Sequence, residues 1–378
     1  MKKTTWLLAL SFCPLAGCSG GTSATADGGT PQHADGGASV AHDGGTSRES
    51  GARTPEAGAV DARAATHDAG TATGTTAGVE CSYGYSGFND SPSVEKTSTA
   101  TWSCTSTLRS LTANGIPDHA TGTFPNTNCP NTIATQTVSA SMTLDPVNTG
   151  TSSAINIVGY AFNGVKFDPS TAGTCTVDDA GTSCTLLGTS GTWNIEALGQ
   201  SSFNFGVDDN NAHVQPDGAY HYHGMPEGIL TKLGKGQAMT LVGYALDGFP
   251  VYARYGYTVA TDATSAIKVI KGSYQFKTTA EAGRPSTATY PLGAFTEDYE
   301  YVAGSGDLDE CNGRTDVTPE FPAGTYHYYI TDTYPFIQRC VKGTATAVSG
   351  GGGNGPGGDG GMMMGPPGGD GGMKGPPP

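Results

Sequence analysis

Three closely spaced histidines are the residues of this sequence whose type and spacing could do chemistry. His213 is followed eight positions later by His221, and His223 comes two positions after that. In a β-strand, successive side chains alternate between the two faces, so His221 and His223 would lie on the same face. His213 could then fold back as a third ligand. Because imidazole suits copper, zinc, iron and nickel, the cluster predicts a transition-metal site.

A second, incomplete copy of this pattern occurs nearer the C-terminus. Tyr326-His-Tyr-Tyr329 matches Tyr220-His-Tyr-His223, so His327 could supply a fourth ligand if the two copies come together. Arg314 stands where the first copy has His213, and the second copy alone therefore lacks two of the three histidines. Two other interpretations stay open, namely histidines that only form hydrogen bonds in a half-buried strand and acid–base catalysis without a metal.

The elements that must position these histidines are themselves duplicated. Residues 158–164 match residues 242–248, and a glycine stands two positions before each Tyr-His pair, at Gly218 and Gly324. The pattern Asp-x-x-Asn precedes both, starting at Asp208 and at Asp309. Matched blocks in the same order predict two related β units, at about residues 154–235 and 238–343. Such units either cover each other's sheets or form one pseudo-symmetric domain.

Strand signals dominate the stretch that contains these blocks. Residues 138–144 alternate between apolar and polar side chains, and no long helical pattern is present. Asn163-Gly164 and Asp247-Gly248 each follow an apolar run, which is a strong hairpin signal because both turn positions need positive φ. The sequence therefore predicts a mainly β fold, an antiparallel β-rich domain over residues 79–348.

The N-terminus has the features of an export signal. Lys2 and Lys3 precede a short apolar run, and Leu15-Ala-Gly-Cys18 resembles the lipobox of bacterial lipoproteins. The resemblance implies that residues 1–17 are a signal peptide and that Cys18 is acylated, which would anchor the chain to a membrane. We expect the outer membrane, facing the periplasm or the cell surface. An ordinary secretory signal is the alternative.

Low-complexity sequence flanks the β-rich region. Residues 18–78 consist mainly of Gly, Ala, Thr, Ser and Asp, and residues 349–378 of Gly, Pro and Met. Neither stretch can bury enough apolar surface to offset its ordering entropy, so we expect a disordered tether and a disordered tail. The thioethers of the tail could recruit Cu(I), which places copper before zinc as the expected metal.

Seven cysteines remain once the signal peptide and the acylated Cys18 are set aside. Cys175 and Cys184 flank a short turn and could form a local disulfide, and Cys311 with Cys340 would clamp the last motif. Two of the remaining three could form a third bridge in an oxidising compartment; they are Cys81, Cys104 and Cys129. An odd count leaves at least one thiol unpaired within the chain.

The composition excludes some partners. Of 378 residues, 19 are Lys or Arg and 34 are Asp or Glu, so the net charge is 19 − 34 = −15. Nucleic acid is excluded as a partner because affinity for phosphate backbones rests on basic clusters. The sequence also has no nucleophile elbow, Walker loop or HExxH motif, and no enzyme class is predicted. The oligomeric state is not predicted.

The motifs together resemble a known family. Tyr220-His-Tyr-His223 with Gly218 upstream, Asp247-Gly-Phe-Pro-Val-Tyr252 and the closing block around Cys311 and Cys340 are similar to the YHYH family of bacterial exported proteins. The resemblance covers about residues 155–343. Arg314 and Tyr329 stand where the family's closing block usually has histidines. The resemblance implies the domain and not an activity.

Three functions follow, in order of preference. The first is metal binding through His213, His221 and His223, with His327 as a possible fourth ligand. It requires imidazoles that converge. The second is a module that binds an extracellular ligand such as a polysaccharide through a row of exposed tyrosines, and a metal-handling protein is a further possible partner. The third is a hydrolase, metal-dependent or acid–base, which requires a deep pocket holding a histidine beside a carboxylate.

Overall fold

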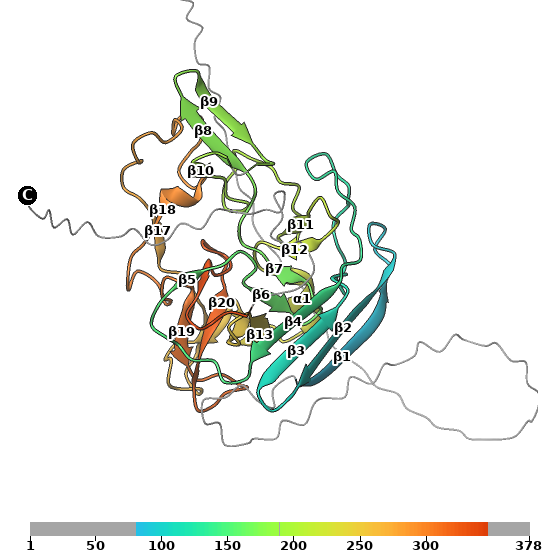
Figure 1. The fold of residues 1–378 in the computed structure, drawn as a ribbon. Helices are drawn as coiled ribbons and strands as arrows, with labels where there is room; N and C mark the ends of the chain where they lie inside the picture. Colours follow the sequence, from blue (N-terminus) through green and yellow to red (C-terminus); the bar gives the residue numbers. More distant parts are fainter. Residues whose placement is uncertain (1–80, 189, 347–378) are drawn as a thin grey trace, which may run out of the picture. The chain divides into compact units, whose positions relative to one another are not determined.

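The described part of the chain is built almost entirely from β-strands. The computed structural model describes residues 81–188 and 190–346, and Figure 1 shows how their strands are arranged. The predicted mainly β fold is confirmed. The expected signal peptide (residues 1–17), Cys18, the expected tether (18–78) and the expected C-terminal tail (349–378) lie outside the described residues. Within the described ranges, no helix is long and apolar enough to cross a membrane.

An eight-stranded sheet forms the centre of this β-structure. Its strand order is β11-β12-β7-β6-β13-β14-β20-β19. The bounds are β6 Gly159–Ala161, β7 Lys166–Phe167, β11 Ala212–Val214, β12 Tyr220–Tyr222, β13 Thr240–Ala245, β14 Pro250–Ala253, β19 Gly313–Asp316 and β20 Thr325–Ile330. The first repeat supplies the four strands of one half and the second repeat those of the other.

The two halves of the sheet are related by a pseudo-twofold axis. From either edge inward, the strands pair first antiparallel, then parallel, then antiparallel. β11 therefore corresponds to β19, β12 to β20, β7 to β14 and β6 to β13. Of the two arrangements that the repeat allowed, the structure has one pseudo-symmetric sheet.

The repeated glycines allow the halves to meet. β6 pairs with β13 in antiparallel register, with Tyr160 opposite Tyr244. A Cβ atom at Gly159 would lie 2.4 Å from the carbonyl oxygen of Tyr244, and one at Gly243 would lie 2.1 Å from that of Tyr160. Any larger residue would push the two central strands apart, which explains the glycine in both copies of the block.

A four-stranded antiparallel sheet, in the order β1-β2-β3-β4, packs against the central sheet. Its strands are β1 Ser82–Asn89, β2 Lys96–Cys104, β3 Leu108–Ala113 and β4 Val138–Thr143. Trp102 and Leu111 share a buried apolar cluster with Tyr160 and Tyr244, and the indole of Trp102 donates to the carbonyl of Phe162 at 2.9 Å. The N-terminal sheet and the repeats thus share one core.

Smaller elements complete the fold. β10 Trp193–Asn194, β8 Thr174–Asp178 and β9 Gly181–Thr185 form a three-stranded sheet. Three two-stranded ribbons are β15 Tyr255–Tyr257 with β16 Ile267–Val269, β17 Tyr274–Phe276 with β18 Tyr299–Tyr301, and β21 Cys340–Val341 with β5 Ser153–Ala154. The helical segments are α1 Glu227–Leu233 and the 3₁₀ turn η1 Thr296–Asp298.

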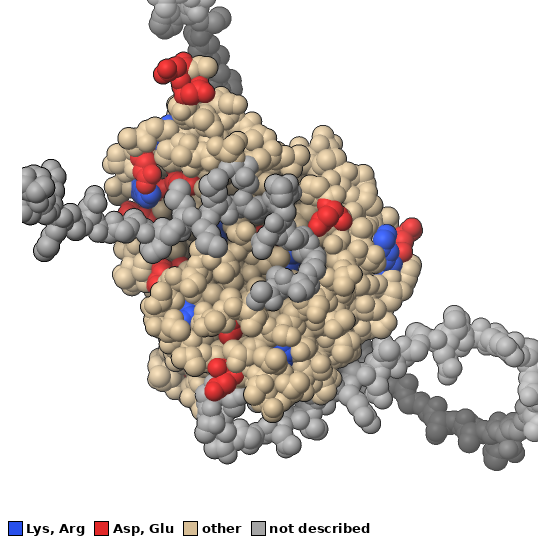
Figure 2. Space-filling model, in the orientation of Figure 1, with Lys and Arg blue, Asp and Glu red and all other residues tan. Residues whose placement is uncertain are grey.

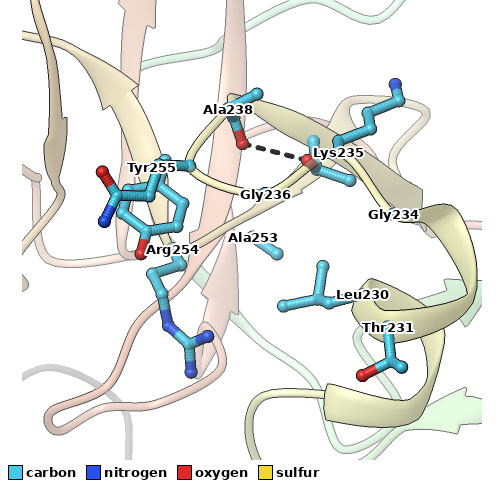
Figure 3. A pocket seen from close by; sticks show the side chains of 11 residues that line it. Leu230, Thr231, Gly234, Lys235, Gly236, Ala238, Ala253, Arg254 and Tyr255 are labelled. Carbon is cyan, nitrogen blue, oxygen red and sulfur yellow. Dashed lines mark hydrogen bonds between the residues drawn. The ribbon is translucent and has the colours of Figure 1, made fainter. Parts of the chain in front are cut away.

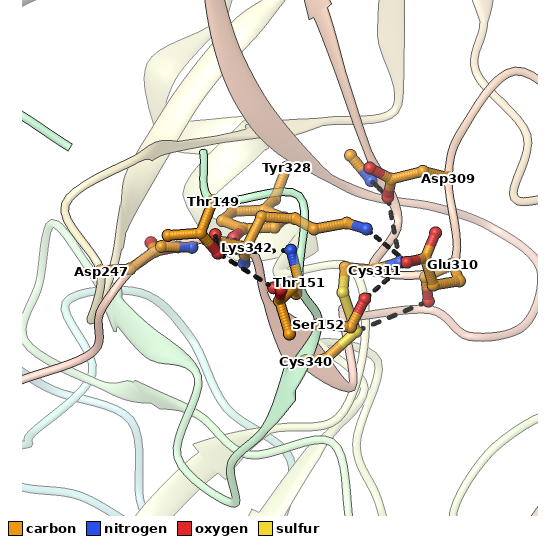
Figure 4. The surroundings of a disulfide bond; sticks show 12 residues. Thr149, Thr151, Ser152, Asp247, Asp309, Glu310, Cys311, Tyr328, Cys340 and Lys342 are labelled. Carbon is orange, nitrogen blue, oxygen red and sulfur yellow. Dashed lines mark hydrogen bonds and ion pairs between the residues drawn. A yellow bond between two sulfur atoms is a disulfide. The ribbon is translucent and has the colours of Figure 1, made fainter. Parts of the chain in front are cut away.

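Three disulfides join six of the cysteines in the described residues. Cys175 is bonded to Cys184 across the β8–β9 hairpin, and Cys311 to Cys340 in the closing block. The third bridge joins Cys81 to Cys104 and leaves Cys129 as a buried free thiol. Figure 4 shows the Cys311–Cys340 bond beside the ion pair of Lys342 with Glu310, which also accepts a hydrogen bond from Ser152 at 2.5 Å.

Charged side chains are sparse on one face of this β-structure. On the face drawn in Figure 2, basic and acidic side chains appear singly or in small groups among uncharged residues. Several basic groups are held by carboxylates, such as Lys268 by Asp307 and Arg254 by Asp332. The face in that view offers no continuous basic surface.

Candidate metal centre

A tight hairpin brings the first two histidines together. β11 and β12 pair antiparallel with His213 directly opposite His221, so both side chains lie on one face of the sheet. The turn between the strands places Gly218 at φ 86°, a conformation that favours glycine. His223 follows immediately after β12, two residues beyond His221, and its backbone N–H donates to the carbonyl of Asn211 at 2.8 Å.

The three imidazoles converge through their Nε2 atoms. The Nε2 of His223 lies 2.9 Å from that of His221 and 3.1 Å from that of His213. One ring nitrogen from each of the three histidines can serve as a metal ligand, and these three atoms all lie within 4.8 Å of one another. All three side chains are buried, with at most 8 % of their surface exposed.

Backbone carbonyls determine which nitrogen of two rings carries a proton. The Nδ1 of His213 lies 2.9 Å from the carbonyl oxygen of Phe205, and the Nδ1 of His221 lies 3.2 Å from that of Ala219. A carbonyl only accepts, so both Nδ1 atoms are protonated and both Nε2 lone pairs point into the cluster. A proton on the Nε2 of His223 can satisfy only one of its two contacts. A bound cation would take up all three lone pairs.

The tyrosines of the motif lie on the opposite face. Tyr220 and Tyr222 are buried in the apolar core, and burial raises the pKa of both phenols well above 10. The hydroxyl of Tyr222 lies 2.5 Å from the Nε2 of His119 and accepts from the amide of Asn163 at 3.0 Å. These rings are the packing layer behind the histidines, so the motif does not present the exposed tyrosine row that a polysaccharide-binding face requires.

Asp208 and Asp247 form turns and hold tyrosines. Asp208 accepts from the hydroxyl of Tyr220 at 2.8 Å, and Asp247 from the hydroxyl of Tyr328 at 2.6 Å. Burial raises the pKa of Asp247, an effect that its hydrogen bonds with Tyr328 and with backbone N–H groups oppose. The role of both aspartates is to fix the turns that lead into the paired strands.

His327 is not part of the cluster, and the prediction of a fourth histidine ligand is wrong. Four strands separate β20 from β12 in the sheet, which corresponds to roughly 24 Å at about 4.8 Å per strand. The pseudo-twofold axis sends equivalent residues to opposite halves of one sheet, whereas the prediction required the copies to converge. The Nε2 of His327 instead lies 2.8 Å from a carboxylate oxygen of Asp316.

The second copy of the site is filled by its own charges. Arg314 lies opposite His327 as His213 lies opposite His221. Its guanidinium forms an ion pair with Asp316, the residue that also holds His327. A permanent cation therefore stands where the first copy has an imidazole lone pair.

Comparison with known proteins identifies the domain. The profile of the family described as YHYH protein matches residues 139–343, more than half of the chain. The chain belongs to the YHYH protein family. The matched region contains the whole eight-stranded sheet, all three converging histidines and the filled second copy. Searches of curated proteins and of solved structures find no significant match.

The YHYH domain also places three buried polar residues next to the histidines, and the sequence analysis missed them. Lys166 lies opposite His221 on the neighbouring strand β7. Its ammonium lies 2.5 Å from the side-chain oxygen of Gln215 and 3.1 Å from Asp168. The repeat could have pointed to Lys166. The match between the two copies ends at Gly164, and Lys166 lies only two residues further along the chain.

One hollow of the YHYH domain lies away from the histidines. Figure 3 shows this hollow, of about 470 Å³, between the C-terminal end of α1 and the end of β14. No histidine lines it, and its arginine, Arg254, is held by Glu227 and Asp332. This hollow therefore lacks the histidine and free carboxylate that a hydrolase would need.

Proposed function

We propose that the YHYH domain binds one transition-metal ion through the Nε2 atoms of His213, His221 and His223. The observation that carries the proposal is the convergence of three buried imidazole nitrogens, with neighbouring Nε2 atoms 2.9 and 3.1 Å apart. In a tetrahedral site with metal–nitrogen bonds of about 2.0–2.1 Å, neighbouring ligand nitrogens are about 3.3 Å apart. The Nε2 atoms of His221 and His213 therefore need to move away from that of His223 by only a few tenths of an ångström.

Copper is the first candidate for the ion and zinc the second. An all-imidazole set accepts both, and the general order of affinities for divalent first-row metals favours copper. The hydrogen bonds from the Nδ1 atoms of His213 and His221 to carbonyl oxygens support binding in either case, because they orient the rings and keep both Nε2 atoms deprotonated.

We also propose that the protein is exported and anchored through lipid on Cys18. Three disulfides among the described residues suit an oxidising compartment outside the cytoplasm. The lipobox-like sequence that ends at Cys18 supplies the anchoring site. A metal site on such a chain would serve uptake, storage or handling of metal at the cell envelope.

Competitive metal loading of the full chain tests the proposed metal site. The protein is incubated with equal amounts of copper, zinc and nickel, dialysed, and examined by elemental analysis beside the His221→Ala/His223→Ala variant. His327→Ala is the matched control, because His327 occupies the equivalent position in the second copy. We expect about one ion per chain in the wild type and in the control and none in the double variant. A folded wild type that retains no ion would overturn the proposal.

A further inference from the structure

Asp168 lies beside the metal site and shares its face of the sheet. β7 runs parallel to β12 with Lys166 beside His221 and Phe167 beside Tyr222. The backbone N–H of Asp168 continues this ladder by donating to the carbonyl of Tyr222 at 3.0 Å. The same register places Asp168 beside His223, on the same face as the three imidazoles.

Of the two oxygens of the Asp168 carboxylate, one contacts polar neighbours and the other has no partner among the described residues. The Oδ2 atom lies 3.1 Å from the ammonium of Lys166 and accepts from the amide of Gln215 at 3.2 Å. Among the residues that the structure describes, no donor reaches the Oδ1 atom, although only 3 % of the residue's surface is exposed. A buried anionic oxygen without a donor is unfavourable unless a cation or a bound water faces it.

The second half of the sheet provides an internal comparison. There the position of His223 is taken by Tyr329, and the residue beside Tyr329 on β14 is Tyr252. Tyr252 is thus the counterpart of Asp168, and Pro250 is the counterpart of Lys166. The copy without the histidine triad therefore has no carboxylate at the position of Asp168, and its own carboxylate, Asp316, lies on β19 and is paired with Arg314 and His327. A carboxylate at this position and the histidine triad occur together in one half only.

We propose, on the basis of the metal site proposed above, that Asp168 makes the site selective for a divalent ion that carries a water molecule. Three histidines leave one position of a tetrahedral ion open. Asp168 does not belong to the group of candidate ligand atoms that lie within 4.8 Å of one another. Its Oδ1 therefore acts through a water molecule, by accepting a hydrogen bond from the water in the open position of the ion. A divalent ion holds and polarises such a water more strongly than Cu(I), which prefers soft ligands.

Two variants separate the action of Asp168 from that of its neighbour. Asp168→Asn removes the anionic charge but also leaves the ammonium of Lys166 without its carboxylate, which by itself would repel a metal. Asp168→Asn/Lys166→Met removes both charges and restores local neutrality. Tyr252→Phe is the matched control, because it changes the counterpart of Asp168 in the half of the sheet that has no histidine triad.

The test measures the affinities of the full chain for Zn²⁺, Co²⁺ and Cu⁺ by competition with chelators, together with the visible spectrum of bound Co²⁺. We expect both Asp168 variants to bind the divalent ions about 10- to 100-fold more weakly, with a changed Co²⁺ spectrum. The neutral double variant is expected to keep a Cu⁺ affinity within about threefold of wild type. Thermal unfolding shows whether each variant is folded, and the neutral double variant carries the test if Asp168→Asn is not.

Three results would overturn the inference. Unchanged divalent affinity in Asp168→Asn would leave the histidine site intact without a role for Asp168. Recovery of divalent affinity in the double variant would assign the effect to the unpaired charge of Lys166. Equal losses for Zn²⁺ and Cu⁺ in the double variant would remove the selectivity. A wild type that binds none of these ions contradicts the proposed metal site itself, which is a different failure from the other three.

Discussion

At the scale of single residues, the site depends on where each ring carries its proton. Carbonyl oxygens hold the Nδ1 protons of His213 and His221, and so both rings present lone pairs to the position that an ion would occupy. Both partners are backbone carbonyls, those of Phe205 and Ala219. The same scale contains a second informative group, a partly buried carboxyl group elsewhere in the fold whose pKa is raised to about 7.

Glu297 predicts a pH-dependent contribution to stability. Burial raises its pKa from 4.5 to about 7, although it accepts hydrogen bonds from Asn194. Because the folded state binds this proton more tightly than the unfolded state, its contribution is complete below pH 4.5 and is lost as the pH rises through 7. Each pH unit between the two pKa values contributes about 1.4 kcal/mol, and the full effect is up to about 3 kcal/mol.

The measurement is the free energy of unfolding of wild type and Glu297→Gln from pH 4 to pH 8. We expect the difference between them to shift in favour of the variant as the pH rises, because glutamine cannot ionise. The Asp262→Asn variant is the control, since Asp262 lies on the surface. A difference between wild type and Glu297→Gln that stays constant across this range would contradict the raised pKa.

Residue types and spacing predicted that the three histidines converge, but they did not predict the polar residues around them. His221 and His223 share a face because of strand alternation, and His213 lies opposite His221 because the intervening turn is short. Asp168 is far from the motif in sequence, and only the parallel pairing of β7 with β12 places it there. Parallel neighbours join segments that no local pattern connects.

At the scale of elements, the β11–β12 hairpin determines whether the histidines meet. Gly218 adopts φ 86° in its turn, and a Cβ atom there would lie 2.5 Å from the Cβ of Ala134. Gly234 after α1 also has positive φ, 61°, but nothing lies within 4 Å of its Cβ position. Substitutions at the two glycines therefore distinguish the cost of backbone strain, which both positions share, from the cost of steric conflict, which only Gly218 has.

We expect Gly218→Ala to lower the free energy of unfolding by about 2–4 kcal/mol and Gly234→Ala by about 1 kcal/mol. In both variants the left-handed backbone conformation of the alanine costs free energy. Only Gly218→Ala also displaces the segment that contains Ala134. Denaturant unfolding of the two variants beside wild type gives the values. Equal effects of the two substitutions would show that the contact with Ala134 is unimportant.

The pseudo-symmetry of the sheet predicts that the second copy can be converted into a metal site. The Arg314→His/Tyr329→His variant restores the imidazoles at both altered positions around His327 and removes the guanidinium that occupies the space. We expect the number of bound ions per chain to rise from one to two in elemental analysis. Arg314→Gln/Tyr329→Phe is the control without imidazoles. A stoichiometry of one in the restored variant would mean that the halves are not equivalent at this position.

The repeat was visible in the sequence, but the side-by-side arrangement of its copies was not. Residues 158–164 and 242–248 identify the units, yet the choice between stacked sheets and one continuous sheet depends on which edges pair. Gly159 and Gly243 make that choice possible, because they allow β6 and β13 to approach at the centre. His327 was wrongly predicted as a fourth ligand for the same reason, because the sequence does not tell which strand edges pair.

At the scale of the whole molecule, the N-terminal sheet and the repeats form one body around a shared core. Trp102 and Leu111 pack with the tyrosines of the central strands, and the YHYH profile begins at residue 139, within β4. The buried contacts of Trp102 with Phe162 and Tyr244 join the N-terminal sheet to the repeats.

The proposed lipid anchor leads to a prediction for the full chain. Cys18→Ser removes the thiol that would be acylated and with it the apolar chains that hold the protein at a membrane. After cell fractionation, we expect wild type in the membrane fraction and the variant in the soluble exported fraction. Cys13→Ser is the control, because Cys13 lies within the expected signal peptide. A Cys18→Ser variant that stays in the membrane fraction would contradict the anchor.

The most direct test of the central claim is X-ray absorption spectroscopy of the full chain after loading with copper or zinc. The account predicts one ion per chain with three imidazole nitrogens at about 2.0–2.1 Å, and the loss of this signal in His221→Ala/His223→Ala but not in His327→Ala. A folded chain whose bound ion shows no imidazole scattering, or the same spectrum in the double variant as in the wild type, would contradict it.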